Sequence, residues 1–248
     1  MKSVFFTVVL LLSASYAEAY NLYHTKSGKK VRWATSYIEV VLDESMAILG
    51  PKPEVKEVLR AAFELWAYDA NLPLHFDLVW DDCGEVANDG NNCIFACADR
   101  EVCYGRPEEK GGTTYVSVSP SSGHISDADV ILNADNWEWD LDGTNEDGLS
   151  LGRVMSHEIG HFLGIDHSDE PEAIMYPILS RDAEVAENLH VDDKEAAVTL
   201  YEDFEEVDEN AGATCSVAYV GQSGVGDNYL LLLIVSIIAA IHIRRQGR

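Results

Sequence analysis

The spacing of apolar residues predicts a long amphipathic helix among strands in the first half of the chain. Apolar side chains recur at helical intervals over residues 55–66, and Pro53 stands where a helix start tolerates proline. Alternating or β-branched runs predict strands at residues 31–33, 37–42, 74–80, 113–118 and 130–132. Because strands and a long helix come first and helices follow, the order indicates one α/β domain of about 180 residues.

The two ends of the chain differ in pattern from the part between them. Residues 1–19 are expected to be a signal peptide, because Lys2 precedes an apolar run that ends in the small-x-small site Ala17-Glu18-Ala19. Cleavage there would make Tyr20 the first residue; the alternative is a buried N-terminal strand or helix. Residues 202–228 are acidic and then rich in Gly and Ser, which predicts an exposed tether.

Residues 229–248 carry a short apolar run followed by arginines, which predicts a membrane anchor or sorting segment. As a helix the run would cover roughly 22 Å, less than the ~30 Å hydrocarbon layer, so a transmembrane helix here requires local thinning. The layout resembles C-terminal sorting signals of exported bacterial proteins. We therefore expect an extracellular or cell-envelope protein, tethered to the membrane or released after processing. The alternative, a C-terminal core helix, should show a polar face, and this run has none.

Composition narrows the class of partner. Hydrophobic residues make up 47% of the chain, which suffices for a packed core and excludes wholesale disorder. The net charge of −26 argues against a nucleic-acid partner, because phosphate binding requires a basic face.

Four of the five cysteines cluster, at Cys83, Cys93, Cys97 and Cys103. An exported chain meets an oxidising environment, so two local disulfides are expected, with three connectivities open. One zinc ion held by all four thiolates is the alternative, although no pair has the usual two-residue spacing. Cys215 is left over, and the sequence leaves open whether it is free, pairs between chains or serves processing.

Candidate chemistry is concentrated between His157 and His167. His157 and His161 are four residues apart, so their rings stand on one face of a helix and can bind one zinc ion. Gly164 can adopt positive φ and end that helix, which allows the chain to bring His167 back as a third ligand. Three protein ligands leave a position for water, the arrangement of a catalytic zinc site.

Glu158 is offset from the ligand face but next to it, within reach of a zinc-bound water. Zinc lowers the pKa of its bound water towards ~7, and a carboxylate can accept the released proton as general base. We therefore expect a zinc-dependent metalloendopeptidase, a hydrolase that acts on polypeptide substrates. Two alternatives remain: a catalytically silent binding module, and a metallohydrolase whose substrate is not protein.

The pattern His-Glu-x-x-His-x-x-Gly-x-x-His resembles the metzincin signature. Ser168, directly after the third histidine, is similar to the matrixin (matrix-metalloproteinase) branch. For residues 20–201 the resemblance implies a metzincin-type catalytic domain with a twisted, mostly parallel sheet, an upper long helix and an active-site helix below. It covers residues 150–201 in detail and the upstream chain only in the order of elements.

The same resemblance implies roles for residues after the zinc motif. Met175, in a matrixin-like Met-turn, would form a hydrophobic floor under the ligands without binding metal. Pro177, Ile178 and Leu179 would begin the wall of the S1′ pocket. The paired aspartates Asp192 and Asp193 would support the Met-turn.

The chain departs from the family pattern in two respects. No cysteine-switch motif precedes the domain, so latency through a thiol on the zinc is not expected. The histidine-rich loop of a second, structural zinc is missing, and His75 and His124 are the only spare histidines nearby, so one catalytic zinc is expected.

Two weaker predictions concern calcium and substrate binding. Asp140, Asp142, Asn145 and Asp147 form a cluster of oxygen donors that could bind Ca²⁺, the alternative being a solvated turn. Residues 113–118 are the candidate edge strand along which an extended substrate would pair.

Overall fold

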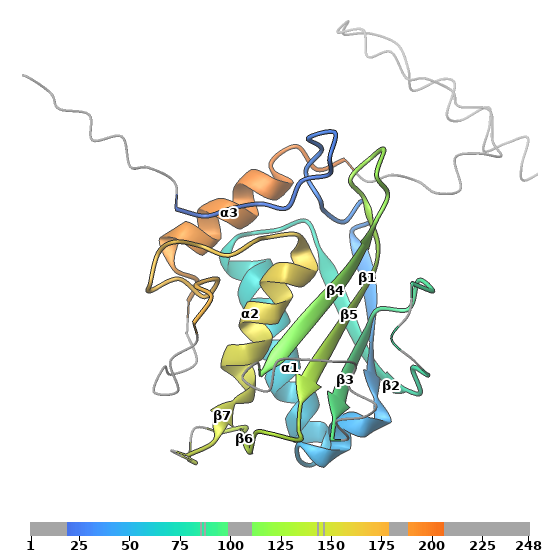
Figure 1. Ribbon diagram of the computed structural model, residues 1–248, viewed down its shortest axis with the longest axis vertical. Coiled ribbons are helices and arrows are strands. Elements are labelled where there is room, and N and C mark those ends of the chain that lie inside the picture. The colour runs from blue at the N-terminus through green and yellow to red at the C-terminus, as the bar shows by residue number, and fades with distance from the viewer. Residues whose placement is uncertain are drawn as a thin grey trace, which may run out of the picture. The chain divides into compact units, whose positions relative to one another are not determined.

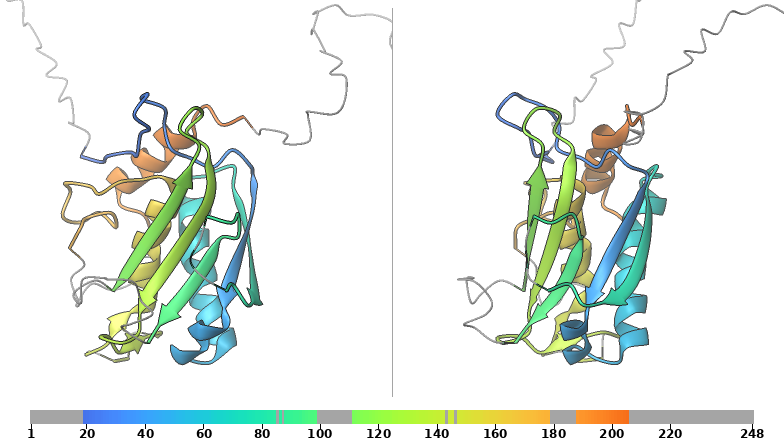
Figure 2. Two further views of the ribbon diagram at one scale, coloured as in Figure 1. Left: turned by 45° about the vertical axis from the view of Figure 1, so that its right-hand side comes forward. Right: turned by 90° about the vertical axis from the view of Figure 1, so that its right-hand side faces the viewer.

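The computed structural model describes residues 19–84, 86, 88–98, 111–142, 144–145, 147–178 and 188–205. Its core is a sheet with α-helices packed against one face (Figures 1 and 2). The elements, in chain order, are β1 (Tyr37–Asp43), η1 (Glu44–Ile48), α1 (Lys52–Asp69), β2 (His75–Asp81), β3 (Cys93–Cys97), β4 (Gly112–Val118), β5 (Ile125–Asn133), β6 (Trp139–Asp140), β7 (Leu149–Ser150), α2 (Leu151–Leu163) and α3 (Val191–Tyr201).

The main sheet has the strand order β2-β1-β3-β5-β4. β1 pairs in parallel with β2 and β3, and β3 pairs in parallel with β5. β4 runs antiparallel to β5 and forms one edge of the sheet. The expected mostly parallel sheet with helices is confirmed, and so is the edge position of residues 113–118.

Packing of α1 against α2 builds the core behind the sheet. The apolar stripe of α1 is buried as its spacing predicts, and it includes Phe63 and Trp66. Trp66 Nε1 donates to the Ser156 carbonyl of α2 at 2.8 Å, and the rings of Phe63 and Phe162 meet edge to face. A buried indole needs such an acceptor, so this contact fixes α2 against α1. The N-terminal half of the domain thereby positions the helix that carries the zinc motif.

Two differences from the predicted strands have a common cause. Residues 31–33 do not form a strand; Arg32 makes only an isolated bridge to His124. β3 was not predicted, because its five residues follow a segment rich in Gly, Asn and Asp. Strands exist only where a partner strand supplies hydrogen bonds, and a local pattern does not reveal that partner. The helix and the other predicted strands are confirmed within a few residues.

A disulfide joins Cys83 to Cys93, with Cα atoms 6.2 Å apart. Cys93 packs with Phe95 and Ile131 in a small cluster of buried residues separate from the main core. One expected local disulfide is therefore confirmed, and the alternative zinc site of four thiolates is wrong, because two of those sulfurs are bonded to each other.

Several predictions fall outside the described residues. They concern most of the signal peptide, the tether beyond residue 205, the C-terminal segment 229–248, Cys103, Cys215 and Leu179. Within the described ranges, none of the helices has the length and apolarity needed to cross a bilayer.

Candidate metal centre

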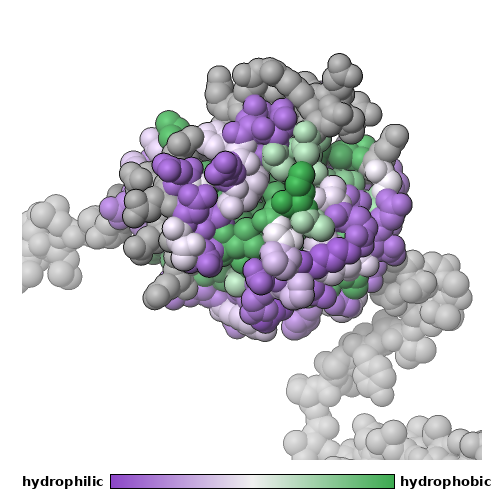
Figure 3. All heavy atoms as spheres, turned by 90° about the horizontal axis from the view of Figure 1, so that it is seen from below, coloured by the Kyte–Doolittle hydropathy of each residue, from purple (hydrophilic) through white to green (hydrophobic). Residues whose placement is uncertain are grey.

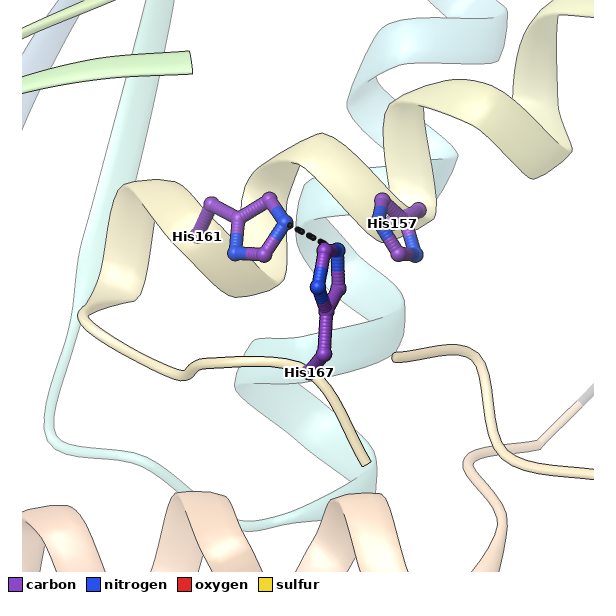
Figure 4. A group of neighbouring side chains, drawn as sticks. All are labelled: His157, His161 and His167. Atoms are coloured by element: carbon purple, nitrogen blue, oxygen red, sulfur yellow. Dashed lines mark hydrogen bonds between the residues drawn. The ribbon is translucent and has the colours of Figure 1, made fainter. Parts of the chain in front are cut away.

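The structure brings His157, His161 and His167 together, although His167 lies beyond the helix that carries the other two. One ligand nitrogen of each ring lies within 4.8 Å of the others (Figure 4). His161 Nε2 and His167 Nε2 are 3.2 Å apart. Two nitrogens bound to a tetrahedral zinc at ~2.0–2.1 Å are ~3.3 Å apart, so this donor set fits zinc.

Gly164 makes the return of the third histidine possible. It caps α2 with φ 104°, a left-handed conformation that side chains other than glycine rarely adopt. A Cβ at this position would also stand 1.9 Å from the carbonyl oxygen of Val31. The left-handed backbone and the close approach of the Val31 carbonyl both require glycine at this position. The predicted turn at Gly164 is therefore confirmed.

Backbone carbonyls orient two of the ligand rings. Nδ1 of His157 is 2.7 Å from the Ile174 oxygen, and Nδ1 of His161 is 2.9 Å from the Ile165 oxygen. A carbonyl only accepts, so Nδ1 carries the proton in both rings and Nε2 keeps a lone pair for a metal. Burial lowers the pKa of His157 to about 3, so its ring is neutral at ordinary pH.

The Glu158 carboxylate is buried against the edge strand β4. Thr114 Oγ1 donates to Glu158 Oε2 at 2.6 Å and to the Glu158 carbonyl at 3.1 Å. Gly112 leaves the space that the carboxylate fills, because a Cβ there would be 2.7 Å from Oε1. Sequence reasoning missed Thr114 and Gly112, since both lie more than 40 residues from Glu158 and carry no motif.

Met175 lies directly against α2. Its side chain is 1% exposed, and a Cβ on Gly160 would be 2.1 Å from its sulfur. Asp193 Oδ2 accepts from the Ile174 N–H at 2.6 Å, and Oδ1 accepts from the Met175 N–H at 3.0 Å. The carboxylate therefore holds the backbone of the turn.

Asp192 binds the residue that directly follows the third histidine. Its Oδ2 accepts from Ser168 Oγ at 2.6 Å, and Ser168 N donates to the Met175 carbonyl at 2.9 Å. The two aspartates thus connect α3 to the segment that follows the zinc motif, in the supporting positions that the resemblance implied.

The proposed S1′ wall is only partly visible. Pro177 and Ile178 are exposed, Ile178 to 72%, and Leu179 is outside the described residues.

A separate cavity of about 700 Å³ lies between α1 and the start of α2, lined by Val58, Leu65 and Ser156 among others, and none of the three histidines borders it. Figure 3, a view from below, shows a band of hydrophobic residues between hydrophilic ones.

The carboxylates among the calcium candidates do not form a group of three or more that could share an ion. Among the described residues, the histidine triad is the one group of His, Cys, Asp and Glu side chains placed to share an ion. Asp140 Oδ1 accepts from the Asn145 N–H, and Asp142 Oδ1 accepts from the Thr144 N–H and hydroxyl. The bonds of Asp142 to Thr144 are those of an Asx turn, so the geometry there favours a turn, and calcium stays a prediction.

Tyr23 is a third residue at the site that the sequence did not reveal, after Thr114 and Gly112. Its hydroxyl is 3.2 Å from His161 Nδ1, and its ring is stacked on the imidazole with centroids 5.8 Å apart. Burial raises the pKa of Tyr23 to about 12, and the nearby Asp166 and Glu158 carboxylates add to the effect. The phenol is therefore uncharged at neutral pH.

Known proteins are similar to the part of the chain that carries the histidine triad. Residues 32–202 match the family model described as matrixin. The chain is 30% identical over 158 residues to metalloendoproteinase 1-MMP of Arabidopsis thaliana, covering 60% of this chain and 38% of that protein. It is 30% identical over 154 residues to macrophage metalloelastase of Rattus norvegicus, covering 60% of this chain and 29% of that protein. It is 33% identical over 153 residues to matrix metalloproteinase-16 of Rattus norvegicus, covering 59% of this chain and 23% of that protein. The matches therefore span well under half the length of each of these relatives.

Proposed function

The chain belongs to the matrixin family, and from this membership and the geometry of its site we propose that it is a zinc-dependent endopeptidase. The observation that carries the proposal is the convergence of three imidazoles, one of which is followed in the sequence by a buried carboxylate. His157, His161 and His167 would hold the metal, and Glu158 follows the first of them in the sequence. No other described group of side chains offers a comparable donor set.

Zinc bound by the three histidines would supply Lewis-acid polarisation of the scissile carbonyl and make a water molecule more acidic. Glu158 then acts as general base: it accepts the proton of the attacking water and delivers it to the leaving amine nitrogen. Thr114 and Gly112 keep the carboxylate in place, by a hydrogen bond to Oε2 and by leaving room for Oε1. A preset carboxylate does not need to reorganise during the reaction.

An extended substrate would pair with the side of β4 that has no neighbouring strand among the described residues. This strand is at the edge of the sheet and carries both residues that hold Glu158. An unpaired strand edge offers backbone donors and acceptors to a peptide, which then lies beside the carboxylate. The Met-turn and the wall residues Pro177 and Ile178 would shape the pocket for the side chain after the scissile bond.

Casein cleavage by the full chain, folded under oxidising conditions, tests the activity. Wild type is compared with Glu158→Ala, each with and without a zinc chelator, and Glu172→Gln serves as control because this carboxylate is exposed. We expect cleavage only by zinc-loaded wild type and the control. Folded, zinc-loaded wild type that leaves casein intact would refute general endopeptidase activity and favour a binding module or a different substrate class.

Export and anchoring form a second part of the proposal, which rests on sequence patterns alone. Residues 1–19 would direct export, and residues 229–248 would anchor the chain or serve as a bacterial sorting segment. N-terminal sequencing and fractionation of expressing cells test this. We expect a mature chain that starts at Tyr20 in the envelope or the medium; an intact Met1 in the cytoplasm would contradict it.

A further inference from the structure

The first described residues of the chain lie along the loop that carries the third histidine. We call residues 19–24 the N-terminal strap. Leu22 and Ile165 form an antiparallel bridge, and the Tyr23 N–H donates to the Gly164 carbonyl at 3.0 Å. The Asp166 N–H donates to the Asn21 carbonyl at 2.9 Å. These bonds hold the strap against the turn that follows α2.

Side chains of the strap reach in two directions. The Asn21 amide donates to the His167 carbonyl at 2.9 Å, and Tyr23 contacts His161. The Tyr20 hydroxyl instead lies 3.1 Å from Thr199 Oγ1 on α3. Tyr20 and Tyr23 are therefore both tyrosines of the strap, but their hydroxyls have different partners. The Tyr23 hydroxyl contacts a histidine of the triad, and the Tyr20 hydroxyl contacts Thr199.

The surroundings of His161 Nδ1 decide what the Tyr23 hydroxyl does. The Ile165 carbonyl, at 2.9 Å, accepts only, so the proton is on Nδ1. The Tyr23 oxygen, at 3.2 Å, then accepts the same proton in a three-centre bond. The phenol ring lies against the imidazole with an interplanar angle of 28°. One contact acts at the edge of the imidazole and the other against its face, so together they restrict rotation of the ring.

We propose that Tyr23 is a positioning residue that fixes the plane of the His161 imidazole and thereby aims Nε2 at the metal. The inference rests on the proposed zinc site. His157 has a different arrangement, since its Nδ1 bonds the Ile174 carbonyl, which is not part of the strap. Partners of this kind, which touch a ligand but not the metal, typically change metal affinity or activity by ~10–100-fold when removed.

The test compares Tyr23→Phe with Tyr20→Phe in the full chain. Each substitution removes one hydroxyl from the strap, but only the first removes a contact to His161. Three properties are measured: zinc affinity by competition with a chelator, the visible spectrum after loading with Co²⁺, and kcat and KM on a peptide. Thermal unfolding of the metal-free proteins checks that all variants fold.

For Tyr23→Phe we expect zinc affinity about 10-fold weaker, a shifted Co²⁺ spectrum and lower kcat at unchanged KM. Tyr23→Leu, which also removes the ring, should change all three further in the same direction. Tyr20→Phe should match wild type. Tyr23→Phe with wild-type affinity and spectrum would overturn the inference.

Failure of the proposed function has a different signature. If wild type binds neither Zn²⁺ nor Co²⁺, the zinc site and the role of Tyr23 fall together. If wild type binds the metals but cleaves no peptide, affinity and spectrum still decide the role of Tyr23.

Discussion

Gly112 and Glu158 share one small space at the edge of the sheet: a Cβ on residue 112 would stand 2.7 Å from Glu158 Oε1 and 2.8 Å from Cγ. A strand residue and a helix residue 46 positions apart are thereby coupled. The strand position requires glycine because the carboxylate is buried against it, while Thr114 donates to the other oxygen. The placement of the proposed general base therefore depends on the edge strand as well as on α2.

Gly112→Ala should displace the Glu158 carboxylate and lower kcat about 10²-fold, since a misplacement near 1 Å has effects of that size. Zinc affinity should stay within a few-fold of wild type, because the atoms nearest to the added Cβ all belong to Glu158. Peptide kinetics and chelator competition measure the two effects.

Gly111→Ala is the matched control for that substitution. A Cβ on Gly111 would meet Leu149 Cδ2 at 2.6 Å, the end of a flexible side chain, and would leave Glu158 untouched. It should reduce stability more than kcat. Equal loss of kcat in both variants would show that general disturbance of β4, rather than the carboxylate contact, is responsible.

Gly160 and Met175 should be energetically coupled. Gly160→Ala places a Cβ 2.1 Å from the Met175 sulfur, so we expect about 1–3 kcal/mol of destabilisation from overpacking. In Met175→Ala the nearest obstruction is gone and Trp66 Cζ2 remains at 3.0 Å, so adding Gly160→Ala should then cost less than it does in wild type. A double-mutant cycle from urea unfolding should give a coupling of about 1 kcal/mol or more; additive single effects would contradict the contact.

The stability of the metal-free chain should fall in acid because of His157. Burial lowers its folded-state pKa from 6.5 to about 3, so the unfolded chain binds the proton first as pH falls. The free energy of unfolding is therefore undiminished above pH ~6.5 and is lost between there and pH ~3, by up to ~1.4 kcal/mol per pH unit.

Urea unfolding at several pH values, with a chelator present, measures this slope. His75→Gln, a substitution of an exposed histidine on β2, should keep the slope of wild type. Titration of the His157 ring by NMR in the folded, metal-free chain gives a direct check, and a midpoint near 6.5 would rule the explanation out.

Proline substitutions in β4 should distinguish backbone hydrogen bonds to the substrate from backbone hydrogen bonds to β5. Adjacent residues of an edge strand direct their N–H groups alternately towards the neighbouring strand and away from it. Of Tyr115→Pro and Val116→Pro, one should therefore fold normally and raise KM, while the other loses a ladder bond to β5 and is less stable. If the variant that folds normally shows wild-type KM, the substrate does not pair with β4.

The zinc motif was predictable because its determinants are local. The i, i+4 spacing of His157 and His161 places both rings on one face of any helix, and Gly164 ends that helix at the required residue. The apolar stripe of α1 was equally predictable, because apolar residues that repeat every 3.6 positions are visible within a short stretch of sequence.

The tertiary structure alone decided which residues surround these ligands. Tyr23 meets His161 across 138 residues, and Thr114 meets Glu158 across 44. The pairing of β3 and the absence of a strand at residues 31–33 likewise depended on partners distant in sequence. The sequence by itself therefore indicated the candidate ligand set, since helical geometry is local. The orientation and support of that set were decided by packing between distant segments, which no local period encodes.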